Sequence, residues 1–146
     1  MNTFVQPEKH RALEIIDAIV ALLEHHLTEP VLRNRLEPAR QVPAVAIKIG
    51  SDEVIGHQSR FTDRRLQIYV DLLIAPEQKA DLDAQTLDLR LKVERLLLAP
   101  DPLKLNWVIE VSDPEMLDPD YNGEGDIPLG ATRLVFAVSY RVEREC

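Results

Sequence analysis

The chain has 146 residues, 17 basic and 25 acidic side chains with a net charge of −8, and 45% hydrophobic residues. This apolar content is too high for a disordered acidic chain, and the length predicts a single domain over 1–146 with one hydrophobic core. The negative charge argues against a protein whose main task is to grip nucleic acid, because that task needs clustered Lys and Arg side chains.

The only cysteine is Cys146, so no internal disulfide can form, as expected of a protein made in a reducing cytosol. The first residues show no basic segment followed by an uninterrupted apolar run. Every apolar run is also shorter than the roughly 18 residues that span a bilayer. We therefore expect neither a secretion signal nor insertion into a membrane.

The clearest helical pattern lies at residues 7–27, where apolar side chains recur at steps of three and four. Pro7 suits a first helical turn, and Pro30 lies just beyond the expected end. The pattern is formed by Leu13, Ile16, Val20, Leu23 and Leu27, with a second stripe of Ala12, Ile15, Ile19 and Leu22 beside it. Because this surface is wider than a sheet needs, we expect part of the helix to contact another subunit.

Two strands are expected next, at residues 44–50 and 66–74. Both segments alternate apolar and polar side chains, which is typical of strands with one buried face. The segment 51–63 between them is polar and charged and contains Gly56, so we expect an extended hairpin loop there. Pro76 closes the second strand.

A second helix is expected from Asp81 or Asp83 to about Ala99. Its apolar residues form two neighbouring lines, Leu87, Leu91 and Leu98 on one and Val93, Leu96 and Leu97 on the other. Alternation at 103–111 and 132–142 then predicts two more strands. The connection 112–130 is rich in Asp, Pro and Gly and is long for a hairpin, which is typical of a functional or partly mobile loop.

The expected order is therefore helix, strand, strand, helix, strand, strand. This order lacks the regular alternation of strands and helices that nucleotide-binding folds show. It favours an α+β domain in which two helices cover an antiparallel sheet of about four main strands.

One segment resembles the front half of an EF-hand calcium loop. Asp118, Asp120 and Asn122 stand at loop positions one, three and five, Asp126 stands at position nine, and a glycine stands at position six. Position twelve, where a glutamate completes the coordination, is Leu129. An acidic, turn-rich loop is the favoured interpretation. A small calcium-binding or metal-dependent module is the alternative from a different functional class.

No catalytic constellation or cofactor motif stands out in the chain. The histidines at 10, 25, 26 and 57 show no zinc-binding spacing. His57 lies near Ser51, Asp52 and Ser59, which are residue types of a hydrolytic triad, but the turn that positions a nucleophile is missing. We therefore expect no catalytic residue, no cofactor, no metal and no enzyme activity.

The most basic short stretch consists of Arg60, Arg64 and Arg65, and a second one lies at 33–40. Neither stretch is interleaved with the aromatic side chains that stack on bases, since Phe61 stands alone. Protein–protein contact or solubility is therefore favoured over contact with nucleic acid.

Several segments, taken in order, resemble the tail terminator proteins of long-tailed bacteriophages, the group that includes the minor tail protein U type. The likeness covers nearly the full chain and rests on element order, lengths and sequence texture rather than on a catalytic motif. The segments that carry it are RALEIIDAIVALL, PAVAIKIG, RRLQIYVDLLI, LDLRLKVERLLLA and TRLVFAVSYRVE.

This resemblance implies a structural role in the virion, without an active site. Proteins of this family form a hexameric ring on the head-proximal end of the tail tube, stop its polymerisation and present a surface to neck or connector proteins. Expected partners are other copies of this chain, the tail tube protein and the connector, in the virion tail or in the host cytoplasm during assembly. Another neck or head–tail joining protein is the alternative within this class.

The resemblance also places candidate contacts on the loops 51–65 and 112–130. Head-to-tail contacts in a ring need two different patches on each copy. DNA would pass through the lumen without specific binding, because an acidic protein repels the phosphate backbone. The candidate interface residues are Glu53, Arg60, Arg64, Arg65, Asp120 and Tyr121.

Overall fold

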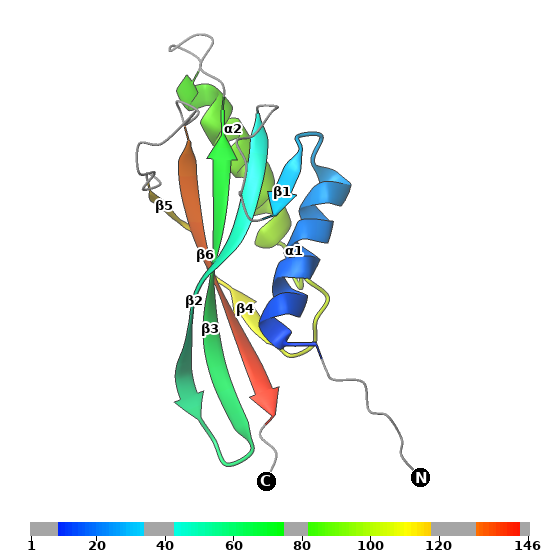
Figure 1. Ribbon diagram of the computed structural model, residues 1–146, viewed down its shortest axis with the longest axis vertical. Coiled ribbons are helices and arrows are strands. Elements are labelled where there is room, and N and C mark those ends of the chain that lie inside the picture. Colours follow the sequence, from blue (N-terminus) through cyan, green and yellow to red (C-terminus); the bar gives the residue numbers. More distant parts are fainter. Residues whose placement is uncertain (1–8, 34–42, 75–81, 118–130, 144–146) are drawn as a thin grey trace.

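The computed structural model describes residues 9–33, 43–74, 82–117 and 131–143, and these residues form an α+β fold, as the sequence predicts (Figure 1). The elements are α1 (Arg11–His26), β1 (Val31–Arg33), β2 (Ala44–His57), β3 (Phe61–Leu73), α2 (Leu82–Leu97), β4 (Val108–Val111), β5 (Glu115–Leu117) and β6 (Thr132–Glu143). Within these residues, no helix is long and apolar enough to cross a membrane.

All six of these strands belong to one mixed sheet in the order β1-β2-β3-β6-β4, with β5 also paired to β6. The neighbours β2, β3 and β6 are antiparallel, whereas β1 pairs with β2 in parallel. The expectation of a purely antiparallel sheet is therefore wrong at one edge. With only three residues, β1 is too short to show the alternation that would reveal it.

The β2–β3 hairpin is much longer than the sequence pattern indicates. The expected loop at 51–63 is mostly strand, because β2 continues to His57 and β3 begins at Phe61. The register shifts between Ile49 and Asp52 and again after Val54. Each irregularity reverses the alternation of faces, so the sequence loses the period that identifies a strand. In Figure 1 the hairpin extends well beyond both helices.

Three other boundaries differ from expectation. Helix α1 begins at Arg11 rather than at residue 7, because His10 caps it: the backbone N–H of Ala12 donates to His10 Nδ1 at 3.0 Å. The strand expected at 103–111 is confined to β4, because the chain before it turns through Asp101 and Lys104 with positive φ angles of 47° and 56°. Strand β5 lies inside the expected connection 112–130.

The core fills the space between the two helices and one face of the sheet. Its fully buried side chains include Ile15, Ile16, Ile19 and Leu23 of α1, Val93 and Leu97 of α2, and Ile68, Val70, Leu134 and Phe136 of the sheet. Most of the wide stripe of α1 thus packs inside the chain, whereas Val20, Leu22 and Leu27 are half-buried and Leu13 is exposed. On α2, Leu87 and Leu91 of the first predicted line are exposed and Leu98 is half-buried, whereas Val93 and Leu97 of the second line are buried. Leucines on two sides of this helix leave its buried face ambiguous in the sequence.

Candidate functional site

Charged and aromatic side chains gather on the sheet face that the helices leave uncovered, which we call the open face. Along β3, Leu66, Ile68 and Val70 point into the core, so the side chains that alternate with them lie on the open face. Strand β6 adds two arginines opposite two β3 aspartates. The open face comprises Lys48, Glu53, Phe61, Asp63, Arg65, Gln67, Tyr69, Asp71, Arg133 and Arg141.

The most buried ion pair of this face joins Asp71 to Arg133. The Nε and Nη2 atoms of Arg133 donate to the two carboxylate oxygens of Asp71 at 2.7 and 3.0 Å. Only 5% of the Asp71 side chain and 15% of the Arg133 side chain are exposed. The guanidinium also lies 4.6 Å from the centroid of the Tyr69 ring. This bidentate geometry fixes β3 against β6.

The same arrangement recurs eight residues away, toward the end of the hairpin. Arg141 donates to both carboxylate oxygens of Asp63 at 2.8 and 3.1 Å, and its guanidinium lies 4.9 Å from the centroid of the Phe61 ring. The hydrogen bonds from Arg141 lower the pKa of Asp63 below its ordinary value of 3.8. Two units of aspartate, arginine and aromatic ring thus connect the same two strands.

Gly50 makes room for the aromatic ring of the first unit. A Cβ atom at this position would lie 2.6 Å from Cζ of Tyr69. The Tyr69 ring therefore lies directly over the β2 backbone, with Lys48 Nζ 5.6 Å from its centroid. Ser51 Oγ donates to Gln67 Oε1 at 2.9 Å beside it. Such a close approach of a side chain to a strand is a role that glycine fills.

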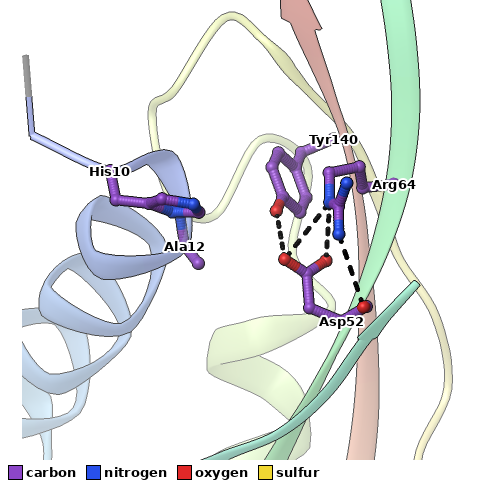
Figure 2. Close-up of polar contacts among 5 residues, drawn as sticks. All are labelled: His10, Ala12, Asp52, Arg64 and Tyr140. Carbon is purple, nitrogen blue, oxygen red and sulfur yellow. Dashed lines mark hydrogen bonds and ion pairs between the residues drawn. The ribbon is translucent and has the colours of Figure 1, made fainter. Parts of the chain in front are cut away.

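A second network lies on the helix-covered side of the hairpin, around Asp52 (Figure 2). The extra residue between Ile49 and Asp52 places Asp52 opposite Leu66, whose side chain is in the core. The hydroxyl of Tyr140 donates to Asp52 Oδ2 at 2.8 Å, and Arg64 Nε lies 3.2 and 3.3 Å from the two carboxylate oxygens. Three strands thus meet at one carboxylate.

Tyr140 connects this network to the start of α1. Its side chain is fully buried and packs edge to face against Trp107, with ring centroids 6.1 Å apart. The guanidinium of Arg11, the first residue of α1, lies 4.5 Å from the centroid of a Trp107 ring. Burial, and secondarily the hydrogen bond to Asp52, raises the pKa of Tyr140 to about 12.

This pKa predicts a loss of stability at alkaline pH. An unfolded tyrosine ionises with a pKa of 10.0, so the folded state favours the neutral phenol of Tyr140. That contribution is complete below pH 10 and is lost as the pH rises to about 12. We expect the free energy of unfolding, measured by urea denaturation, to fall less across this window in Tyr140→Phe than in wild type. Equal declines in the two proteins contradict the assignment.

The structure brings several of the predicted interface residues together on the hairpin. Glu53 and Arg65 form a loose ion pair at 3.6 Å, with 62% and 46% of their side chains exposed. Arg60 is exposed at the turn. Arg64 instead forms an ion pair with Asp52 of the same chain. The remaining candidates, Asp120 and Tyr121, lie outside the described residues, as does the calcium-like loop with Asp118, Asn122 and Asp126.

Ser51 and His57, two of the residue types of a hydrolytic triad, contact other side chains. Ser51 donates to Gln67, while His57 Nδ1 lies 3.5 Å from the hydroxyl of Thr62. Across 9–33, 43–74, 82–117 and 131–143, no group of three His, Cys, Asp or Glu side chains could hold a metal ion.

No family model matches the chain. No curated protein is significantly similar to it either. The function of these surfaces must therefore be argued from their own geometry together with the resemblance in element order.

Sequence reasoning missed the residues that organise these networks, Asp52, Asp71, Arg133, Tyr140 and Arg141. Two signals were present. Asp71 interrupts the apolar segment YVDLL, and a carboxylate in a buried strand normally has a partner. The arginines of the last strand also stand eight residues apart, like the two aspartates of β3. Pairing the two strands requires their register, which the sequence does not contain.

Proposed function

We propose that this chain is a structural virion protein, a tail terminator that forms a ring on the head-proximal end of a phage tail tube. In this role it stops tube polymerisation and receives the neck or connector protein. The proposal extends the resemblance in element order, and the α+β fold is compatible with it.

The observation that carries the proposal is the number of separate surfaces that expose large apolar side chains. A monomer with a filled core has no internal use for them, whereas a ring component must contact neighbouring copies, the tube and the connector. These side chains are Leu13 on α1, Ile49, Val54 and Ile55 on the hairpin, Ile109 on β4, Leu87 and Leu91 on α2, and Met116 and Leu117 on β5.

The surface formed by α2 and β5 supports a contact with a second kind of protein. It contains an open groove of about 650 Å³ whose lining includes Leu87, Met116 and Leu117. Leu91 lies one turn further along α2 and extends the apolar surface. This groove is separate from the hairpin, so it can contact the tube or the connector while the hairpin contacts another copy.

The paired charges of the open face support passage of DNA past the protein. Arg65, Arg133 and Arg141 each face a carboxylate of the same sheet. Paired arginines offer little positive potential to phosphates, and the chain as a whole carries −8. The ion pairs therefore stabilise the sheet, while the surface attracts the phosphates of DNA only weakly.

The proposal is tested with tail tubes assembled from the tail tube protein of the same virus. Adding the chain should stop elongation, and negative-stain electron microscopy should show one ring at one end of each tube. A Leu87→Asp, Met116→Asp variant should leave the ring intact and weaken its binding to the tube or the connector. Tubes that elongate at an unchanged rate and carry no ring at either end contradict the proposal.

A further inference from the structure

We infer that copies of this chain join head to tail through opposite edges of the sheet. The β2 edge of the hairpin in one copy contacts the β4 edge of the next copy. This inference rests on the ring of the proposed function and names the two surfaces that build it.

The strand pairing places the two edges at the same level of the sheet. Val54 pairs with Arg64, Arg64 with Tyr140, and Tyr140 with Val108, so these four residues form one row. In the described part of the chain, no further strand pairs with β2 or β4 at the ends of this row. Three antiparallel steps separate β2 from β4, so the two strands are antiparallel to each other. A second copy in the same orientation therefore places its Val108 beside Val54.

Both edges expose apolar side chains at this level. On β2, 44% of Val54 and 42% of Ile55 are exposed, and on β4 53% of Ile109 is exposed. Ile109 is the extra residue of a bulge between Val108 and Glu110, which displaces it from the regular pairing. An open groove of about 550 Å³ lies beside it, lined by Arg11, Phe61, Asn106, Trp107, Val108, Ile109, Arg141 and Glu143. The groove can receive the side chains that project from β2.

The two edges also differ in charge. Residues 48–65, which form the outer part of the hairpin, carry four basic and three acidic side chains. Residues 101–117, which contain β4 and β5, carry four acidic side chains and one basic side chain. Two β4 edges repel each other, whereas a β4 edge attracts a hairpin. The contact between unlike edges is therefore favoured over a symmetric contact between like edges.

The bulges determine the kind of contact. Strand β2 has register irregularities on both sides of Asp52–Val54, and β4 has one at Ile109. Bulged edges do not offer the regular row of hydrogen-bonding groups that an added strand needs. The copies are therefore held by apolar side chains and charges rather than by a continuous sheet.

The test uses sedimentation velocity of the full chain over a range of concentrations. Wild type should assemble, whereas Val54→Asp and Ile109→Asp should each remain monomeric. Mixing the two variants should give a 1:1 dimer and no ring, because each supplies the intact edge that the other lacks. Ala21→Asp, which places the same charge at an exposed position of α1 outside its apolar stripes, is the matched control and should assemble like wild type.

Formation of the mixed dimer also shows that both variants are folded. If either aspartate variant fails to fold, the same test is repeated with the two single variants Val54→Ser and Ile109→Ser. Assembly of both edge variants at the concentrations at which wild type assembles overturns the inference about the edges, but it does not contradict the proposed ring. Association of Ile109→Asp alone, while Val54→Asp is monomeric, identifies a symmetric hairpin contact and overturns it too. A wild-type chain that is monomeric at every concentration overturns the contact between copies, and tube capping then tests the proposed function separately.

Discussion

The Asp71→Ala variant is expected to lose about 3 kcal/mol of folding free energy, because it leaves a nearly buried guanidinium without its bidentate carboxylate. Arg133 cannot turn to solvent easily, since it is held between Asp71 and the ring of Tyr69. Urea denaturation measures the loss as a lower midpoint.

The matched control for this variant is Glu53→Ala on the same face. Its partner Arg65 is half exposed and 3.6 Å away, so we expect a change within about 0.5 kcal/mol. Replacing both members of the buried pair, as Asp71→Leu with Arg133→Met, should recover most of the loss, because neither member of this ion pair then stays buried without the other. Equal effects of Asp71→Ala and Glu53→Ala contradict the role assigned to burial.

The Asp52→Ala variant is expected to lose about 2 kcal/mol, because it leaves the buried hydroxyl of Tyr140 without an acceptor and removes the partner of Arg64. Near-ultraviolet circular dichroism should change as well, since Tyr140 packs against Trp107. Thermal and urea unfolding measure the stability.

Coupling tests this network more sharply than the single variant. Tyr140→Phe added to Asp52→Ala should cost much less than it costs in wild type, because the hydrogen bond is already gone. Asp17→Ala, which removes a carboxylate paired with Lys9 and Arg33 at the surface, should change stability by less than about 1 kcal/mol. Additive effects of Asp52→Ala and Tyr140→Phe contradict a shared network.

The parts of the fold that could be predicted are those with an uninterrupted period. Helix α1, the straight part of β3 and strand β6 bury regular sets of apolar side chains, and their patterns identify them. Strands β1 and β5 are too short to have a period, and the bulges of β2 reverse its alternation in the middle. The buried face of α2 could not be predicted, because leucines lie on two sides of the helix. Which side is buried depends on how the helix packs against the sheet.

The exposure of the charged segment 51–65 was predictable, but its pairing was not. Its polar and charged composition predicts a surface segment, and Glu53, Arg60 and Arg65 are exposed on the hairpin. The sequence does not show that Arg64 turns inward to Asp52, because this depends on one extra residue in β2. It also does not show which arginine of β6 meets which aspartate of β3, because those partners lie 62 and 78 residues apart.

Strand β6 joins the two edges of the proposed contact into one sheet. It pairs with β3, β4 and β5, and it supplies Arg133, Tyr140 and Arg141 to all three networks that fix the hairpin. On the ribosome, β2 and β3 emerge more than fifty residues before it, so the β3 edge that faces β6 is at first unpaired and the arginines that bind Asp63 and Asp71 have not yet been made. Pairing over such a separation is slow. Both edges of the proposed contact are therefore completed only after β6 has been synthesised and paired, so under the proposed assembly self-association follows the synthesis of this strand.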